Sequence, residues 1–571
     1  MPKADDDVSR LKSLFAEGQL VHPYLTKEFF QDSSPSAEHH VALNFVDLAA
    51  SLAICCGVVT PPCCEDDELV FVGNNIISTT LTEEDIQTKR FQLAAEIDGD
   101  GRKHIVLILC DGMGNSILQN ATPNQQQSFL NRNNQRHRLR AVFPSTTPAA
   151  LTSLATAAWP GHHAMPGWNL RDKKGCDFPG NNNDKAHPPV QLLVLSDHIK
   201  DARSGKLASE MGFESWDEVF VKQPWARQVT NTSSNNANKR RRMIYINAYN
   251  GDDYQEWAQG IKNQNEKKRK YSDATDFSEW QRGKQASGTK QQQSSSTLFD
   301  TAKIEETAFD TLGEPKGSED AIQYYRDGIN AALDLIAKAE REGESTFTYL
   351  YTAHPDKHMH ALGVEHAEVR KVVRGIESET ERFWRVLGDR EALLSEEYYL
   401  DSGVKQEKKC SKKDDSNVVD ATVVLTADHG HVTVQPKDMV VLPAAILELL
   451  EYACIGVHGK GRHGYLHCRA GLQNLLQQRW NTMDELKQNF LLLTIDEAIG
   501  LGLFGPKCMR MEVRPRLGDF VSISIGMKTL ITPSENEKFC KGCQCQGAHG
   551  SLHPEEMHIP FILLEPSSRS G

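Results

Sequence analysis

Carboxylate and imidazole side chains directly follow three apolar runs of the chain, and one more histidine lies in a Gly-Ala-His-Gly sequence near its end. These residues are Asp111, Asp356, His360, Asp428, His429 and His549. Oxygen and imidazole ligands in this mixture suit zinc or a similar divalent ion, and there are enough of them for two ions. Because two neighbouring ions can clamp the attacking and leaving oxygens of an in-line displacement, the pattern predicts a metal site suited to phosphoryl transfer.

Thr147 is the candidate nucleophile of this site. It precedes Pro148 and a run of small residues that favours a helix. If a helix begins at Pro148, Thr147 lies at or near its N-cap and the amides of residues 149–151 point at the group that Thr147 attacks. Such an arrangement suits an anion, above all a phosphate. Two alternatives stay open: Thr147 is only a capping residue, or Thr146 takes its role if the register is shifted by one.

The elements that position these side chains form an α/β pattern. Apolar or β-branched runs at His104–Cys110, Thr346–Thr352 and Ala421–Thr426 each end in an acid or a histidine. A long amphipathic helix that begins at Ser318 precedes the second run. Another helix, with apolar residues from 369 to 387, lies between the second run and the third. We therefore expect a mainly parallel sheet with helices on both faces, with the candidate ligands at its carboxyl edge.

The 571 residues exceed one minimal domain, and a 39% hydrophobic content is enough for a substantial core. We expect an N-terminal extension with leading elements at 1–95, which end in an acidic connection to Asp98-Gly-Asp-Gly101, and one catalytic domain at 96–565 with a β-like stretch at 519–525. Residues 227–300 are rich in Asn, Gln, Ser and basic residues, which predicts a low-complexity insertion within that domain. Residues 401–417 predict a charged loop.

Charge and composition restrict the class of partner. A net charge of −13 argues against a general binder of nucleic acids or anionic membranes. The N-terminus has no secretory signal pattern and the apolar run 41–59 is too broken to span a bilayer, so we expect a soluble cytoplasmic protein and a buried helix in that run. Basic runs at 239–242 and 267–270 leave a nuclear location open. Thirteen cysteines in such a protein indicate free thiols rather than disulfides.

Five short motifs occur in an order that indicates a family. They are Asp111-Gly112, Phe143-Pro-Ser-Thr-Thr147, Pro355-Asp-x-x-x-His360 with Gly363, Ala427-Asp-His-Gly430 and Gly547-Ala-His-Gly550. With these motifs the chain resembles the type I phosphodiesterase and nucleotide pyrophosphatase branch of the alkaline phosphatase superfamily, and within it is most similar to bacterial-type alkaline phosphatase family proteins. The resemblance covers residues from about 100 to 565 and implies an alkaline-phosphatase-like core.

The resemblance also implies roles for the candidate residues. One divalent ion would be held by Asp356, His360 and His549, and the other by Asp111, Asp428, His429 and the oxygen of Thr147, with zinc (Zn2+) as the expected metal. Thr147 would attack phosphorus and form a phospho-threonine intermediate. The implied function is metal-dependent hydrolysis of a small phosphate ester, as a phosphodiesterase or nucleotide pyrophosphatase.

Some features depart from that family's pattern. The asparagine that helps to hold the phosphate in the pyrophosphatases aligns near Trp168, with Asn169 one place on. Five further histidines near the motifs are expected to be structural or to support the ligands, with His553 the best candidate for an extra role. They are His354, His358, His431, His553 and His558.

Other functions are weighed against this one. A sulfatase needs a cysteine or serine followed by an arginine, and Thr147-Pro-Ala-Ala-Leu151 offers neither. A cofactor-independent phosphoglycerate mutase typically uses a serine. A phosphomonoesterase usually needs an arginine clamp, which the sequence does not locate, so diesters or pyrophosphates are favoured. A metal-binding pseudoenzyme that recruits partners through its insertion is the alternative from another class.

Overall fold

A computed structural model describes most of the chain. The described residues are 7–31, 41–58, 69–70, 83–99, 101–172 apart from 123, 125, 135 and 136, 190–194, 199–201, 221–226 apart from 223, 241–247, 317–395, 417–451, 457–459, 461–506, 509–540 and 546–566. Most of the expected insertion at 227–300 therefore lies outside the described residues, as does all of the charged loop at 401–417 except Asn417. The basic run at 267–270 also lies outside them.

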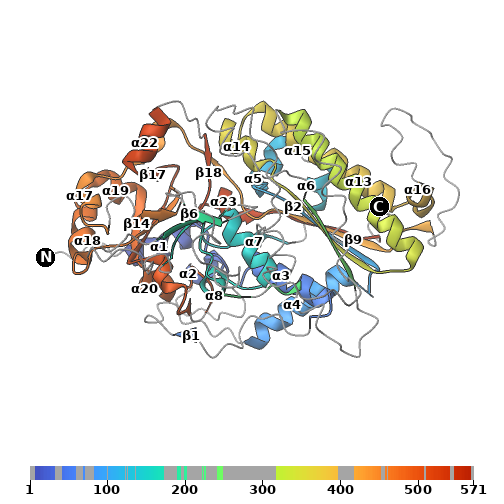
Figure 1. Cartoon of the computed structure of the whole chain (residues 1–571), viewed down its shortest axis with the longest axis horizontal. Helices are drawn as coiled ribbons and strands as arrows, with labels where there is room; N and C mark the ends of the chain where they lie inside the picture. Colours follow the sequence, from blue (N-terminus) through green and yellow to red (C-terminus); the bar gives the residue numbers. More distant parts are fainter. Residues whose placement is uncertain are drawn as a thin grey trace, which may run out of the picture.

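A five-stranded sheet with the order β20-β9-β2-β8-β7 forms the centre of the molecule (Figure 1). Its strands are β2 (His104–Cys110), β7 (Arg242–Asn247), β8 (Thr346–Thr352), β9 (Ala421–Thr426) and β20 (Phe561–Leu564). β7, β8, β2 and β9 are parallel, and β20 pairs antiparallel with β9. Every residue of β2, β8 and β9 is buried, as expected for parallel strands covered on both faces. The expected mainly parallel sheet and its three expected strands are confirmed.

Helices cover both faces of this sheet. Figure 1 shows α13 (Ser318–Glu342) and α15 (Ala367–Leu387) on one side, and α3 (Phe45–Cys55), α4 (Glu83–Asp98) and α7 (Thr147–Thr156) on the other. The two long helices agree with the sequence prediction. The N-cap of α13 is Gly317, because the hydroxyl of Ser318 donates to Glu368 instead of capping the helix.

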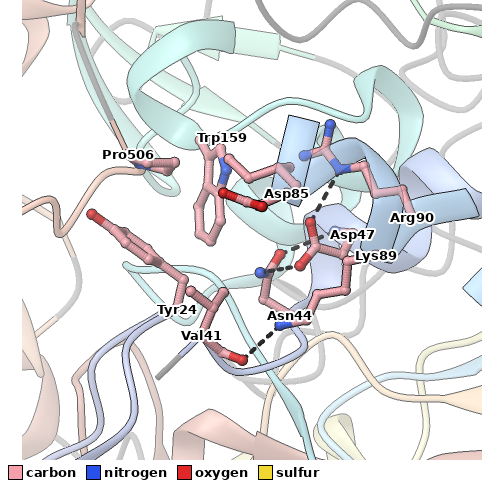
Figure 2. Close-up of a pocket in the computed structure, with 10 residues that line it drawn as sticks. Tyr24, Val41, Asn44, Asp47, Asp85, Lys89, Arg90, Trp159 and Pro506 are labelled. Carbon is pink, nitrogen blue, oxygen red and sulfur yellow. Dashed lines mark hydrogen bonds and ion pairs between the residues drawn. The ribbon is translucent and has the colours of Figure 1, made fainter. Parts of the chain in front are cut away.

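The leading segment contributes two helices to the core. α3 is buried at ten of its eleven positions, which confirms the buried helix expected in the run 41–59. α4 corrects an expectation, because this stretch was predicted to be an acidic connection and is instead a helix. A buried ion pair of 3.1 Å between Arg90 and Asp47 ties α4 to α3, and Lys89 Nζ donates to the Val41 carbonyl at 2.6 Å. Figure 2 shows these contacts at the edge of a pocket closed by Tyr24 and Trp159.

A second, smaller sheet lies beside the central one. It has the order β12-β13-β16-β14, and all its strands are antiparallel: β12 (Val457–Gly459), β13 (His463–Leu466), β14 (Phe490–Thr494) and β16 (Phe520–Ser524). The β-like stretch predicted at 519–525 is thus confirmed. One face of this sheet covers an apolar cluster of its own that includes Trp480.

The remaining elements are short. The helices are α1 (Asp7–Glu17), α2 (Lys27–Gln31), α5 (Asn115–Ala121), α6 (Phe129–Asn133), α8 (Pro160–His163), α14 (Asp356–Leu362), α16 (Arg390–Ser395), α17 (Ala444–Leu447), α18 (Gln473–Asn481), α19 (Asp484–Asn489), α20 (Ile495–Gly500), α21 (Arg514–Leu517), α22 (Pro533–Cys540), α23 (Pro554–Met557) and the 3-10 turn η8 (Pro436–Asp438). The strands are β1 (Leu69–Val70), β3 (Leu139–Arg140), β4 (Asn169–Asp172), β5 (Val190–Val194), β6 (Ile199–Asp201), β10 (Val432–Thr433), β11 (Met439–Val441), β15 (Met509–Arg510), β17 (Thr529–Ile531), β18 (Gly547–Ala548) and β19 (His558–Ile559). Within the described residues, every helix is too short or too polar to cross a bilayer.

Candidate metal centre

The carboxyl ends of three neighbouring strands bring buried acids and histidines to one edge of the central sheet. Asp111 directly follows β2, Asp356 begins α14 just after β8, and Asp428 and His429 follow β9. Because these strands are parallel neighbours in register, their ends meet. His549 approaches the same edge from the loop after β18, and its ring stacks on that of His429 at 3.8 Å between centroids.

Thr147 reaches this edge from the first turn of α7. Its Oγ1 lies 3.1 Å from His429 Nε2 and 3.5 Å from Asp111 Oδ1. The helix begins at Thr147 and its N-cap is Thr146, one residue earlier than expected. Ala150 donates its amide to the Thr146 carbonyl at 2.9 Å, so this amide is not free to meet an anion as the sequence had suggested.

Two groups of buried side chains could each hold a divalent ion. We call Asp356, His360, His431 and His549 the four-residue group, and Asp111, Asp356 and His429 the three-residue group. Within each group the candidate ligand atoms all lie within 4.8 Å of one another. Asp356 belongs to both, so the two positions adjoin. Five of the seven expected ligands belong to these groups. The other two lie beside His429 Nε2, Thr147 Oγ1 at 3.1 Å and Asp428 Oδ2 at 3.3 Å.

Backbone carbonyls orient three of the imidazoles. His360 Nδ1 lies 2.9 Å from the Gly547 carbonyl, His429 Nδ1 lies 2.9 Å from that of Gly430, and His549 Nδ1 lies 2.7 Å from that of Ser145. Since a carbonyl oxygen can only accept, Nδ1 carries the proton in each ring and Nε2 keeps its lone pair. A partner on the far nitrogen is the usual arrangement for metal-ligating histidines.

Three polar atoms at this edge make no hydrogen bond that meets the geometric criteria, which tests whether the residues fit a cation. Asp356 Oδ1, Asp428 Oδ2 and His549 Nε2 are buried and make no hydrogen bond to any described residue. Buried polar atoms without partners are costly, and a bound cation would satisfy all three at once. The donor set of carboxylate oxygens and imidazole nitrogens is also the set that suits zinc. The residues therefore fit divalent ions.

The electrostatics of the carboxylates point the same way. Burial, reinforced by the charges of Asp428 and Asp356, raises the pKa of Asp111 well above its usual range. Burial likewise raises the pKa of Asp428 to about 7. For Asp356, burial acts in the same direction, but the neighbouring imidazoles outweigh it and hold the pKa well below its usual range. In two of the three acids burial thus disfavours the charged form, which a bound cation would favour.

Several contacts hold the acids in place. Asp428 Oδ1 accepts the amides of Gly112 at 3.0 Å and His429 at 2.9 Å, and Tyr351 Oη donates to Asp111 Oδ2 at 2.5 Å. Gly430 is required because a Cβ at this position would lie 1.9 Å from the Glu555 carbonyl oxygen. The sequence did not predict a role for Tyr351, because it is one of several aromatic residues in a buried strand.

A buried ion pair supports the loops that carry Thr147 and His549. Arg462 and Glu556 are fully buried, and Glu556 Oε1 accepts Arg462 Nε at 2.9 Å. The other oxygen, Glu556 Oε2, accepts the Ser551 amide at 2.7 Å and lies 3.4 Å from Ser145 Oγ. Ser145 Oγ in turn accepts the Gly550 amide at 3.0 Å. No sequence pattern indicates this pair, whose members are 94 residues apart.

Four of the five additional histidines lie outside the two groups. His354 and His358 contact each other through their Nδ1 atoms at 3.1 Å. His553 caps α23 by accepting the Glu555 amide, and His558 lies in β19. The fifth, His431, is a member of the four-residue group, which was not predicted.

His163 and Asn169 do not join the groups either. His163 Nε2 lies 2.9 Å from Ser153 Oγ. Asn169, which was considered for a phosphate contact, donates to the Gly459 carbonyl at 3.4 Å.

Comparison with solved structures gives similarities at low sequence identity. Phosphonoacetate hydrolase from Sinorhizobium meliloti 1021, solved with phosphonoformate, is 14% identical with a TM-score of 0.46, over 81% of this chain and 90% of that chain. Murine ectonucleotide pyrophosphatase/phosphodiesterase 5 is 11% identical with a TM-score of 0.44, over 80% of this chain and 87% of that chain. An inactive variant of the murine protein was solved with AMP. Among curated proteins no sequence match was found.

Family comparison extends over most of the sequence. Residues 105–552 match the family described as type I phosphodiesterase / nucleotide pyrophosphatase. The matched region runs from β2 through the loop that carries His549, so it contains all the candidate ligands and Thr147. The mainly parallel sheet with helices on both faces is the α/β architecture that the motifs implied. Because the match covers well over half of its length, the chain belongs to the type I phosphodiesterase / nucleotide pyrophosphatase family, whose members are metal-dependent hydrolases of phosphoric esters.

Proposed function

We propose that the chain hydrolyses phosphodiesters or pyrophosphates of small, nucleotide-like molecules at a site that holds two divalent ions, with Thr147 as the nucleophile. The proposed ligands are those expected from the sequence: Asp111, Thr147, Asp356, His360, Asp428, His429 and His549. The observation that carries the proposal is the approach of Thr147 Oγ1 to His429 Nε2 and Asp111 Oδ1 at the meeting point of two candidate metal groups. We propose zinc because the ligands are imidazole nitrogens and carboxylate oxygens.

The side chains divide the work of the reaction. Bound divalent ions supply positive charge that favours the deprotonated form of a neighbouring hydroxyl and offsets the charge of a phosphate. Asp111 and His429 orient Thr147 Oγ1, which attacks phosphorus while the bond to the leaving oxygen breaks. The phosphoryl group is then on the threonine, and water releases it and regenerates the hydroxyl. The fixed position of Thr147 at the start of α7 reduces the entropy cost of this attack.

The preference for diesters rests on the arginine closest to the network around Ser145. Arg462 donates to Glu556, to Ser524 Oγ at 2.9 Å and to the carbonyls of Gly526 and Lys528 at 2.5 and 3.0 Å. With its donors used in this way and the side chain fully buried, Arg462 does not offer the fork that a monoester dianion usually needs. A diester, which carries one charge less, has no such requirement.

The test compares hydrolysis of a nitrophenyl diester and a nitrophenyl monoester. The wild-type protein should prefer the diester, and Thr147→Ala should lose at least about a hundredfold in kcat, because it removes the nucleophile and one ligand of the second ion. Thr146→Ala is the matched control, because this neighbouring hydroxyl is also buried but lies at the N-cap. Unchanged turnover in Thr147→Ala, together with loss of turnover in Thr146→Ala, would identify Thr146 as the nucleophile. Activity with neither ester, in a protein that binds metal, would favour the pseudoenzyme.

A further inference from the structure

His431 lies inside the cluster of ligands although it is absent from the set that the motifs implied. It follows His429 and Gly430, just before β10, and its side chain is fully buried. Its Nε2 is 2.9 Å from Asp356 Oδ1, and its ring centroid is 4.5 Å from that of His360 and 5.0 Å from that of His549. The imidazole therefore faces the same point as the other members of the four-residue group.

His431 Nδ1 has no hydrogen-bond partner among the described residues, and Nε2 has only the close approach to Asp356 Oδ1, which does not have the geometry of a hydrogen bond. A buried imidazole in this state is costly, because each nitrogen loses its bond to water without a replacement. Packing holds the ring in place, since Gly547 leaves room that a Cβ would fill to within 2.9 Å of His431 Cε1. A side chain that is held firmly, aimed at a carboxylate and left without hydrogen bonds is arranged as a ligand.

The distances within the group agree with one ion bound to four protein atoms. Zinc bonds of about 2.0–2.1 Å in a tetrahedron separate neighbouring ligand atoms by about 3.3 Å. From Asp356 Oδ1 the separations are 2.9 Å to His431 Nε2 and 4.0 Å to His549 Nε2, and from Asp356 Oδ2 the separation is 3.4 Å to His360 Nε2. These values scatter around the expected one, and small rotations of the side chains would equalise them.

We propose that His431 Nε2 is a fourth protein ligand of the ion held by Asp356, His360 and His549. This inference rests on the proposed two-ion site and adds to it a difference between the two positions. Four protein ligands form a closed set of the kind found in structural zinc sites, whereas the position beside Thr147 remains open to substrate. The first ion to bind therefore occupies the four-residue group and is retained, and the ion beside Thr147 is the exchangeable one.

Titration of the ion-free protein with Zn2+ in competition with a chromophoric chelator tests the order of binding. The wild type should bind two equivalents in separate steps, and His431→Asn should weaken the first step by at least about tenfold. His463→Asn is the matched control, because this histidine is also buried and without hydrogen-bond partners but belongs to neither group. Its first step should be unchanged.

X-ray absorption of the protein loaded with one equivalent of Zn2+ tests ligation directly. The wild type should show three imidazoles, and His431→Cys should replace one of them by a sulfur at about 2.3 Å. Two imidazoles in the wild type would overturn the inference even if neither variant folds. An unchanged first step in a folded His431→Asn protein that binds two equivalents would also overturn it and leave the proposed function standing. A wild type that binds no Zn2+ would refute both.

Discussion

Glu556 offers the sharpest test of how the protein supports the candidate site. Both members of its ion pair with Arg462 are fully buried. If Glu556 is replaced by Gln, the guanidinium keeps its bonds to Ser524, Gly526 and Lys528 but loses its counter-charge. Breaking a buried pair from one side costs about 3–5 kcal/mol, because a charge is left uncompensated in the interior. We expect Glu556→Gln to lower the free energy of unfolding by about that amount.

The same substitution should reduce activity through the loops that Glu556 holds. Glu556 Oε2 accepts the Ser551 amide and the hydroxyl of Ser145. The carbonyl of Ser145 in turn accepts His549 Nδ1. Loosening these loops misplaces a candidate ligand and the segment before Thr147. We therefore expect a fall in kcat for the nitrophenyl diester even at temperatures where the variant is folded.

The pH dependence gives this prediction a sign. Burial alone would raise the pKa of Glu556, but Arg462 outweighs it, and the pKa in the folded protein lies below the ordinary value of 4.5. A carboxyl with a lowered folded pKa contributes stability above about pH 4.5 and loses it as the pH falls through the folded pKa. The difference between wild type and Glu556→Gln should thus be largest near neutrality and shrink in acid.

Chemical unfolding followed by circular dichroism between pH 3 and pH 8 measures this difference. Glu555→Gln is the control, because Glu555 is the adjacent residue and is exposed. It should remain close to wild type at every pH. The reasoning is refuted if Glu556→Gln stays within about 1 kcal/mol of wild type at neutral pH, a loss typical of an ordinary surface substitution.

Two further predictions concern the acids of the candidate site. In protein stripped of ions by a chelator, the raised pKa of Asp428 means that the folded state binds a proton that the unfolded state releases. The melting temperature should therefore fall as the pH rises from about 4 to 7, and Asp428→Asn should flatten this slope. Parallel curves of melting temperature against pH for the two proteins would contradict the assignment. Tyr351→Phe removes the 2.5 Å bond to Asp111 and should weaken binding of the second Zn2+ equivalent by about 10–100-fold in the competition titration, with the first equivalent unaffected.

The strands that carry the candidate ligands could be predicted because burial and chemistry leave marks close together in the sequence. Each of β2, β8 and β9 is an unbroken buried run, and an acid follows it within four residues. α4 lacked such a signal. Its buried apolar residues, Leu93, Ala94 and Ile97, occupy only its last turns, while Phe91 on the same helix is 50% exposed. With so little periodicity, the acidic character of the stretch dominated the interpretation.

Contacts between distant segments could not be predicted in the same way. Arg462 and Glu556 become partners only after the smaller sheet packs beside the loop that leads into α23. His431 illustrates a more local difficulty. Its spacing from His429 is visible in the sequence, but the direction of its ring depends on the backbone between β9 and β10, which the sequence pattern does not specify.

The contacts of Thr147 favour the proposed role as nucleophile over that of a capping residue. A capping threonine accepts an amide of the first turn with its hydroxyl, and its loss would cost about 1 kcal/mol of stability and no chemistry. Here the N-cap is Thr146, whose side chain makes no capping bond, and Pro148 has no amide to offer in the first turn. Thr147 Oγ1 instead faces Asp111 and His429. A hydroxyl that is not used by its own helix and lies beside two candidate ligands is better explained by chemistry than by capping, which is why Thr147→Ala should affect turnover far more than stability.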